Sequence, residues 1–370
     1  MLRRRDFITV LFGGAALLCG GTLMGVLSAC STPGASSDAD ASGANADGSN
    51  ATAPDSATAT DAATADTAAE PATLTEFLFD TVIDISAYCS QELLDSVYER
   101  LVFFEDIFSR TREGSDIYQI NAAAGAPVEV HSETADIIAR AHEFSELSGG
   151  LFDISIGAVT CLWDFSEGII PEPGELAAAL EHIDYRNIEV KGNTVTLADS
   201  QAKLDLGGIA KGYIADDVVA LLKEGGCQSA NINLGGNVYV LGSKPDGSPW
   251  NVGVQDPFES RGAIIGSVPL SDQSVSTSGP YERGFEADGV FYHHILDPRT
   301  GYPVQTDLAS TTIISTSSTT GDALSTTTFL MGANAALELI DSDAQASLKG
   351  IFVDSEGEVI CSRDASINLL

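Results

Sequence analysis

The stretch LDLGGIAKGYIADD, residues 204–217, joins a short apolar run through two adjacent glycines to an amphipathic segment that reaches Leu222. This pattern predicts a strand, a glycine turn and a helix. Backbone N–H groups at a helix start, with Lys211 in the first turn, suit a phosphate or diphosphate. The spacing matches neither the Walker motif nor the dinucleotide fingerprint, and Gly207 and Gly208 could equally serve tight helix packing.

A second segment, YERGFEADGVFYHHILDPRTGYP at residues 281–303, combines two adjacent histidines with Asp297, Arg299 and several Gly and Pro residues. The apolar run before the histidines predicts a strand that directs His293 and His294 toward opposite faces. A hairpin whose Asp, Pro, Gly and Arg only build turns and pair charges is the alternative. The clustering of these residues favours a ligand-binding loop.

A third segment, GDALSTTTFLM at residues 321–331, places Asp322 and Thr326 four residues apart at the start of a helix-like run. At that spacing their side chains share one helix face. A carboxylate, a hydroxyl and a backbone carbonyl, completed by ligand phosphates, are oxygen donors of the kind that Mg²⁺ favours. Alternatively, Asp322 caps the helix and Thr326 bonds back to its own i−4 carbonyl. Beside the other two segments, a metal-assisted diphosphate site is the sharper hypothesis.

Taken together, these segments resemble the FAD:protein FMN transferases of the ApbE family. The resemblance runs from about Phe79 to Leu330 and rests on seven motifs in the family's order. The motifs are SDIYQINAAAG (115–125), GGLFDISIGAV (149–159), LDLGGIAKGYIADD, INLGGNVYVLG (232–242), VSTSGPYER (275–283), HHILDPRTGYP and DALST. The resemblance implies an enzyme that binds FAD with Mg²⁺ and transfers the FMN half, through its phosphate, to a Thr or Ser hydroxyl of another flavoprotein, releasing AMP.

Carried over residue by residue, the resemblance places the metal on the Asp322 and Thr326 side chains and the Gly208 carbonyl. The residues that it places against FAD are Phe79, Tyr118, Leu151, Phe152, Asp153, Lys211, Asp216, His294, Asp297 and Arg299. His294 is the predicted catalytic residue, either as the base for the acceptor hydroxyl or as a hydrogen-bond partner of the flavin or ribose. The family usually shows Met-Gly-Thr where this chain reads Phe79-Asp80-Thr81, and Phe79 could stack where Met would pack.

The N-terminal residues predict export. Three arginines and Asp6-Phe7-Ile8 precede an apolar stretch at 10–27, which ends in Leu-Ser-Ala-Cys at Cys30. We interpret residues 1–30 as a signal peptide with a lipobox, because the small residues before Cys30 and the polar sequence after it argue against a membrane-spanning helix. Twin-arginine and general secretion are both compatible with this segment. We therefore expect an extracytoplasmic protein that is lipid-anchored to the cell membrane through Cys30, with an exported or membrane flavoprotein as acceptor.

The rest of the chain divides into a tether and a domain. Residues 31–72 are mostly Ala, Ser, Thr, Asp and Gly without a basic residue, which predicts a disordered acidic tether. Residues 73–370 fit one α+β domain, with two related α/β lobes and mixed sheets implied by the resemblance. Helices are predicted at 91–108, 134–147, 174–182, 209–223 and 323–331, and strands at 77–88, 231–241 and 311–316.

Charge and cysteine content exclude several classes of partner and site. With 18 Lys and Arg against 53 Asp and Glu, the net charge of −35 argues against nucleic acid and against an anionic lipid surface. Beyond Cys19 in the signal and Cys30, four cysteines remain at scattered positions: Cys89, Cys161, Cys227 and Cys361. This spacing is not that of a zinc site, and the four could pair after export or be buried as small hydrophobes. We predict no catalytic cysteine.

Three functions compete on this sequence. The transferase leads, followed by an FAD pyrophosphatase that yields FMN and AMP with water as acceptor, and by a flavin-binding lipoprotein without catalysis. Asp322 with Thr326 argues against the last, because simple flavin binding needs no metal. Whether water or an acceptor hydroxyl reaches the phosphate distinguishes the first two.

Overall fold

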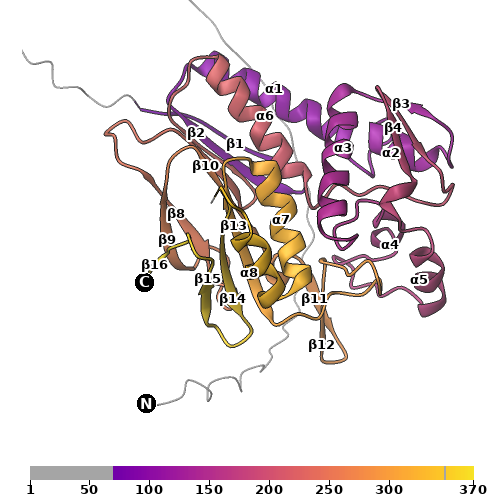
Figure 1. Cartoon of the computed structure of the whole chain (residues 1–370). Helices are drawn as coiled ribbons and strands as arrows, with labels where there is room; N and C mark the ends of the chain where they lie inside the picture. Colours follow the sequence, from indigo (N-terminus) through magenta and orange to yellow (C-terminus); the bar gives the residue numbers. More distant parts are fainter. Residues whose placement is uncertain (1–69, 346) are drawn as a thin grey trace, which may run out of the picture. The chain divides into compact units, whose positions relative to one another are not determined.

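The structure is a computed structural model that describes residues 70–345 and 347–370 (Figure 1). The predicted signal peptide, its lipidation site Cys30 and the predicted tether up to residue 69 lie outside the described residues. Ala72, the last residue of the predicted tether, opens strand β1 (Ala72–Leu78). In the part of the chain that the structure describes, no helix is long and apolar enough to cross a membrane.

An antiparallel sheet forms the centre of the fold, with eight strands in the order β1-β2-β6-β7-β10-β13-β14-β15. After β1 these strands are β2 (Thr81–Ala87), β6 (Ala230–Leu234), β7 (Asn237–Leu241), β10 (Gln273–Ser278), β13 (Leu308–Ser315), β14 (Lys349–Asp354) and β15 (Val359–Cys361). Short hairpins join β1 to β2, β6 to β7 and β14 to β15. Every neighbouring pair in this sheet is antiparallel, including pairs that no hairpin joins, so the prediction of mixed sheets is wrong for these residues.

Two tight turns divide segments that we expected to be single strands. The predicted strand at 77–88 turns at Phe79 and Asp80, whose φ angles are 56° and 57°. The predicted strand at 231–241 turns at Gly235 and Gly236, with φ of 63° and 97°. A two-residue hairpin turn needs positive φ, which glycine adopts freely. For Phe79 and Asp80 this conformation costs on the order of 1 kcal/mol or more per residue. The Phe-Asp pair lacks the usual turn signal, which explains the missed hairpin.

Helices cover one face of the central sheet and a small sheet covers the other. On the first face lie α1 (Gln91–Phe108), α6 (Ala210–Glu224), α7 (Ser318–Met331) and α8 (Ala333–Asp341), as Figure 1 shows. The second face packs against β8 (Trp250–Gln255), β9 (Ile264–Leu270) and β16 (Asn368–Leu369). Successive side chains of a strand point to opposite faces of the sheet, so one strand contributes to both cores. Ile313 packs with α7, and its neighbour Ile314 packs with β8 and β9.

The remaining elements lie beside the helical face. They are α2 (Asp116–Ala122), α3 (Ser132–Leu147), α4 (Gly157–Thr160), α5 (Pro173–Leu180), the 3-10 turns at Tyr185–Asn187 and Pro280–Glu282, the small sheet of β3 (Val128–Glu129), β5 (Thr194–Leu197) and β4 (Ile188–Lys191), and the hairpin of β11 (Gly284–Ala287) and β12 (Val290–His293). This hairpin packs on the segment between α4 and α5 through aromatic contacts of Phe285 and Tyr292 with Trp163 and Phe165. Aromatic packing therefore holds the β11–β12 hairpin in place.

The α+β class is confirmed, as are the helices predicted at 91–108, 134–147, 174–182 and 209–223, whose ends shift by at most two residues. The helix predicted at 323–331 begins earlier, at Ser318, because Ser317 caps it by accepting from the Thr320 N–H. The strand predicted before Gly207 is wrong, since only Lys203 forms a bridge there, with Ile156. The relation of two lobes stays a prediction.

Candidate active site

Helices α6 and α7 contact each other at Gly212. A Cβ on this residue would lie 2.3 Å from the Ser318 carbonyl oxygen and 2.7 Å from Asp322 Cβ, so only glycine permits this approach. The Gly212 N–H donates a hydrogen bond to Asp322 Oδ2 at 2.9 Å. The residue that follows Lys211 thereby holds the buried Asp322 carboxylate against the first turn of α6.

Three consecutive threonines on α7 behave differently. The hydroxyls of Thr327 and Thr328 donate to the carbonyls four residues earlier, each at 2.7 Å. Thr326 Oγ1 instead lies 3.4 Å from Ser278 Oγ, and 3.4 Å from the point where a Cβ on Gly208 would stand. The alternative in which Thr326 bonds back along its own helix is therefore not what the structure shows. Gly208, Thr326 and, one helical turn away, Asp322 come together.

These three residues offer oxygen donors that suit a hard cation. Asp322 Oδ2 is engaged by Gly212, and Oδ1 accepts no hydrogen bond from the residues that the structure describes. Within residues 70–345 and 347–370, no group of three or more His, Cys, Asp and Glu side chains is placed to hold a metal ion. A cation here would thus rely on one carboxylate, one hydroxyl and one carbonyl, with water and ligand phosphate completing its shell. That donor set fits Mg²⁺, which usually keeps several non-protein ligands.

The two adjacent histidines have different roles in the fold. His293 is buried, and its Nδ1 accepts from the Ile295 N–H while Nε2 donates to the Val304 carbonyl, both at 3.3 Å. His294 Nδ1 lies 3.1 Å from the Arg283 carbonyl, which can only accept, so Nδ1 carries the proton. In the neutral ring of His294, Nε2 is then left with a free lone pair. Both ring nitrogens of His293 are engaged, whereas Nε2 of His294 is free, and the role of His294 as a base stays a prediction.

The His294 ring is uncharged at neutral pH. Burial lowers its pKa to about 4, and the positive charges of Arg283 and Lys211 act in the same direction. The hydrogen bond to the Arg283 carbonyl opposes them but is weaker than burial. Of these two residues, Arg283 contacts the ring directly through its backbone carbonyl.

Lys211 and Arg283 differ from Arg299 in their pairing. In the described part of the chain neither forms an ion pair with a carboxylate. Arg299 pairs with Asp297 of its own turn, with Nε 2.9 Å from Oδ1 and Nη2 2.6 Å from Oδ2. Burial acts to raise the pKa of Asp297, but the Arg299 hydrogen bonds hold it below its usual range. Of these three cations, Lys211 and Arg283 are therefore the two without a carboxylate partner.

Two carboxylates that we predicted against FAD are engaged in the fold. Asp153 accepts from the N–H and hydroxyl of Ser155 and from the Tyr185 N–H, and burial raises its pKa despite these bonds. Asp216 accepts from the backbone N–H groups of Ser318 and Thr319 at the start of α7. Both side chains therefore stabilise local structure, and their contact with FAD stays a prediction.

Apolar residues predicted to contact the flavin lie at different distances from the glycine turn. Phe152 is buried beside Gly208, where a Cβ would be 3.1 Å from its ring, and Leu151 is its half-buried neighbour. Phe79 lies on the β1–β2 turn, where its N–H donates to Glu105. Phe152, Asp322 and Thr326 thus lie around the glycine turn and the first turn of α6, whereas Phe79 is on a separate element.

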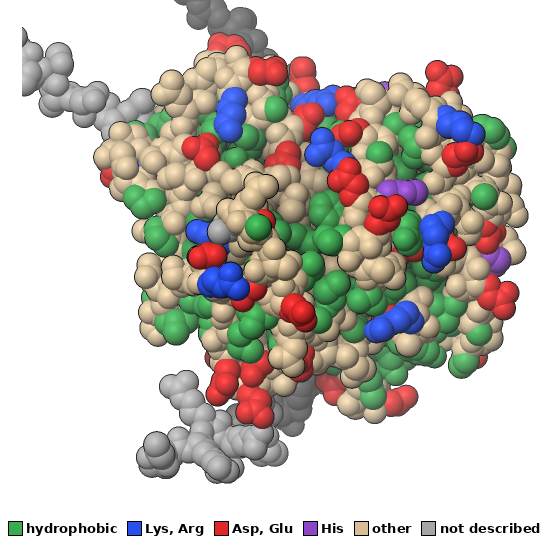
Figure 2. All heavy atoms as spheres, in the orientation of Figure 1, with side chains coloured by type: hydrophobic (Ala, Val, Ile, Leu, Met, Phe, Trp, Pro, Cys, Tyr) green, Lys and Arg blue, Asp and Glu red, His purple; other side chains and the backbone are tan. Residues whose placement is uncertain are grey.

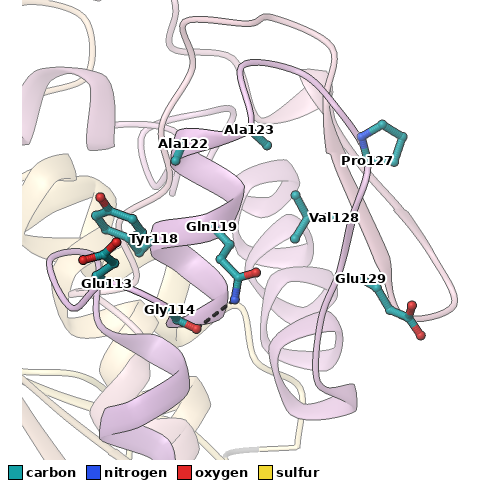
Figure 3. A pocket seen from close by; sticks show the side chains of 9 residues that line it. All are labelled: Glu113, Gly114, Tyr118, Gln119, Ala122, Ala123, Pro127, Val128 and Glu129. Atoms are coloured by element: carbon teal, nitrogen blue, oxygen red, sulfur yellow. Dashed lines mark hydrogen bonds between the residues drawn. The ribbon is translucent and has the colours of Figure 1, made fainter.

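Tyr118 lies on α2 and lines an open depression between this helix and β3 (Figure 3). The other residues of the depression are Glu113, Gly114, Gln119, Ala122, Ala123, Pro127, Val128 and Glu129. None of the other predicted site residues lines it. One turn further along α2, Asn121 exchanges hydrogen bonds with the N–H and carbonyl of Leu204, at 2.6 and 2.9 Å. Helix α2 therefore anchors the segment that leads into the glycine turn.

Ser278 was absent from the predicted residues, and Arg283 was noted in the sequence only as a possible anion contact, like Lys211 and Arg299. Ser278 Oγ lies 2.8 Å from Ser325 Oγ and 3.4 Å from Thr326 Oγ1. Its signal in the sequence is the alternation of serines at 274, 276 and 278, which puts a row of hydroxyls on one face of β10 beneath α7. Arg283 holds His294 through its backbone, which no side-chain pattern reveals.

A buried carboxylate against a helix start, with unpaired cations and a neutral imidazole near by, is an arrangement typical of enzymes that act on phosphate groups. On the face that Figure 2 shows, basic side chains are interspersed with acidic ones. The model of the ApbE family matches residues 79–352, and the chain belongs to this family.

Comparison with known proteins agrees with this assignment. An FAD:protein FMN transferase of Treponema pallidum is 40% identical over 257 residues, covering 65% of this chain and 71% of the relative. One of Klebsiella pneumoniae is 36% identical over 291 residues, covering 77% and 90%. The crystal structure of the ApbE protein of Thermotoga maritima matches with a TM-score of 0.73 at 33% identity, covering 80% of this chain and 97% of that one. The apo flavinyl transferase ApbE of Pseudomonas stutzeri matches with 0.70 at 28%, covering 80% and 95%.

Proposed function

We propose that this chain is an Mg²⁺-dependent FAD:protein FMN transferase that links FMN through its phosphate to a Thr or Ser hydroxyl of an acceptor flavoprotein and releases AMP. The observation that carries the proposal is the hydrogen bond from Gly212 to Asp322. It puts a buried carboxylate beside Lys211, at the start of α6, in a chain whose relatives are named FAD:protein FMN transferases.

The reaction has a simple balance of bonds. The acceptor hydroxyl oxygen attacks the phosphorus on the FMN side of the FAD diphosphate, a P–O bond forms to the acceptor, and the P–O bond to the AMP phosphate breaks. The hydroxyl proton needs a base, and AMP leaves with the added negative charge. The site must therefore accept one proton and stabilise phosphate oxygens.

We assign the removal of the acceptor hydroxyl proton to His294. Its Nδ1–H is held by the Arg283 carbonyl, which orients the ring and leaves Nε2 free to accept the hydroxyl proton. Because its pKa is lowered to about 4, the ring is already neutral before the reaction. General-base catalysis of this kind contributes roughly 10²–10⁴-fold to a rate.

The diphosphate charge would be met by the two unpaired cations and the start of α6. Lys211 lies in the first turn of this helix, and Arg283 adjoins His294. The helix dipole at such an end also favours an anion. Mg²⁺ held by Asp322, Thr326 and the Gly208 carbonyl would supply further neutralisation of the diphosphate oxygens. Gly212 keeps the Asp322 carboxylate in place for that purpose.

We infer the location and partner from the N-terminal sequence. Export and lipid attachment at Cys30 would put the domain outside the cytoplasm at the membrane. Its acceptor would then be an exported or membrane flavoprotein with an exposed Thr or Ser. The large negative charge of the chain gives no support to a nucleic-acid partner.

The test is to incubate the purified chain with FAD, Mg²⁺ and a candidate FMN-binding acceptor, recording the intact mass of the acceptor and the AMP released. We expect a mass gain matching covalent FMN, with equal AMP, abolished by a chelator, by acceptor Thr→Ala and by Asp322→Asn. The matched control is Asp95→Asn, which alters an exposed carboxylate on α1 that only accepts from Gln91.

Two results would contradict the proposal. AMP that appears at the same rate with or without acceptor, and without an adduct, would establish the FAD pyrophosphatase. Binding of FAD with neither AMP nor adduct across several acceptors would establish a flavin-binding lipoprotein.

A further inference from the structure

Two cysteines that the proposed reaction does not use lie side by side at the far end of α6. Cys227 follows the last turn of this helix, and Cys89 precedes the first turn of α1. Cys227 Sγ lies 3.8 Å from the carbonyl oxygen of Tyr88, the residue joined to Cys89, although these positions are 139 residues apart in sequence. The two thiols are therefore neighbours in space.

The two chain segments are held together on both sides of the cysteines. On one side, the Tyr88 N–H donates to the Ser229 carbonyl at 2.8 Å, which continues the pairing of β2 with β6. On the other side, a Cβ on Gly225 would lie 2.4 Å from Leu93 Cδ2, so the end of α6 is pressed against the start of α1. The positions of the two sulfurs are thus fixed by the sheet and by helix packing.

The surroundings of the thiols are those of a structural pair. Cys227 is buried and donates to the Ser229 carbonyl at 3.4 Å, while the half-buried Cys89 donates to the Ser90 carbonyl at 3.4 Å. Burial and the adjacent Cys227 thiol raise the pKa of Cys89 to about 11. A thiol that is protonated at neutral pH is a weak nucleophile, which argues against a catalytic dithiol.

We propose that Cys89 and Cys227 form a disulfide in the exported protein, joining the start of α1 to the end of α6. The contact of Cys227 Sγ with the Tyr88 carbonyl and the Tyr88–Ser229 hydrogen bond bring the two segments together just beyond the ends of β2 and β6, and a disulfide requires such a short separation. The proposal rests on the predicted export, since extracytoplasmic compartments allow disulfides to persist. The other two cysteines have different surroundings. Cys161 Sγ lies 3.7 Å from Lys203 Nζ, and Cys361 on β15 is the strand partner of Ile351 on β14.

The oxidation is an exchange with another disulfide, either a small-molecule disulfide such as oxidised glutathione or a protein disulfide. One thiolate of the pair attacks the oxidant and forms a mixed disulfide, releasing the first oxidant thiol. The second thiolate attacks the mixed disulfide and releases the second thiol. Two electrons and two protons pass to the oxidant, and one S–S bond forms in the protein.

We expect this bond to affect stability rather than catalysis. Lys211 is at the opposite end of α6, about 20 Å away along a helix of this length. A disulfide that closes a loop of more than a hundred residues mainly restricts the unfolded chain. For a domain of this size, we expect a rise in Tm of roughly 5 °C or more.

The experiment uses the whole chain, reduced and then equilibrated with oxidised glutathione, followed by peptide mapping by mass spectrometry and by thermal unfolding with and without reductant. We expect a linked peptide that contains Cys89 and Cys227, and a Tm that falls on reduction. The Tm difference should vanish in Cys89→Ser and Cys227→Ala and persist in the controls Cys161→Ser and Cys361→Ser. FMN transfer at low temperature should be unchanged by Cys89→Ser.

Three results would overturn the proposal: a link between other cysteines, glutathione adducts on Cys89 without an internal link, or an equal Tm in the oxidised and reduced chain. Because Cys89 is only half-buried, Cys89→Ser keeps the test interpretable should the buried Cys227→Ala misfold. Transfer activity is measured separately, so failure of this proposal is distinct from failure of the proposed reaction.

Discussion

The backbone N–H of Gly212 donates to the carboxylate of Asp322 at 2.9 Å, across 110 residues of sequence. This contact exists because Gly212 has no side chain, and any Cβ there would overlap the backbone of α7 at Ser318. The glycine in the first turn of α6 thus sets the position of the only carboxylate among the three predicted metal donors.

We predict that Gly212→Ala separates α6 from α7 and displaces Asp322. Overpacking of this kind costs about 1–3 kcal/mol, and we expect FMN transfer to fall at least tenfold. Thermal unfolding and the acceptor mass assay measure the two effects. The matched control is Gly174→Ala in the first turn of α5, where a Cβ meets nothing within 4 Å and alanine should be tolerated. Equal activity in the two variants would refute the role we give to Gly212.

We predict an unusually low acid limit for catalysis. Burial holds the pKa of His294 at about 4, so its free Nε2 stays unprotonated well below the ordinary histidine range. The kcat/KM for FAD should hold through pH 6 and fall only as the pH approaches 4. His294→Gln should lower it about 10²-fold or more and remove this acid limb. An acid limb centred near pH 6.5 in the wild-type chain would contradict the assignment.

The imidazole of His294 should also make the free energy of unfolding depend on pH. Because the pKa of His294 is lower in the folded than in the unfolded chain, the unfolded chain binds more protons between about pH 6.5 and 4. Its contribution to stability is therefore present above pH 6.5 and is lost as the pH falls toward 4. Thermal unfolding at pH 7 and pH 5 should show a smaller loss for His294→Gln than for the wild type. A loss of the same size in both chains would assign the effect to other groups, such as the buried His293.

We predict that Lys211 and Arg283 contribute to FAD binding more than surface cations do. Each lacks a carboxylate partner among the described residues, and both affect His294. Lys211→Gln and Arg283→Gln should each raise the KM for FAD about tenfold, since a charge-assisted contact to phosphate is worth roughly 1.5–3 kcal/mol. Lys191→Gln is the control, because this exposed lysine pairs with Glu189 on β4. A KM shift in the control as large as in the two variants would indicate only a general charge effect.

We predict that Asp216 acts as a helix cap. It accepts from the Ser318 and Thr319 N–H groups at 2.7 and 2.9 Å, so Asp216→Ala should cost about 1–2 kcal/mol of stability. The measurement compares the Tm with the FAD affinity of the folded chain. Should the affinity fall and the Tm stay unchanged, Asp216 would be an FAD ligand instead.

The tertiary structure decided several roles that no local pattern carries. Of two adjacent histidines, His293 has both ring nitrogens hydrogen-bonded, to Ile295 and to Val304. His294 is bonded only through Nδ1, and its Nε2 is free. Of three adjacent threonines, Thr326 alone contacts Ser278 instead of the carbonyl four residues earlier. These differences depend on which long-range neighbour each side chain meets.

By itself, the sequence determined the α+β class, most of the helices and the family, while the site residues that it indicated stay predictions. It could do so because helical periodicity, glycine turns and motif order are local properties of the chain. Only the tertiary structure decided that Gly212 holds Asp322, that Asp216 caps α7, that Arg283 orients His294 and that Cys89 meets Cys227. The contacts of Gly212, Asp216 and Cys227 span 110, 102 and 139 residues, and the packing of the helices on the central sheet brings those segments within reach. The β11–β12 hairpin brings Arg283 beside His294.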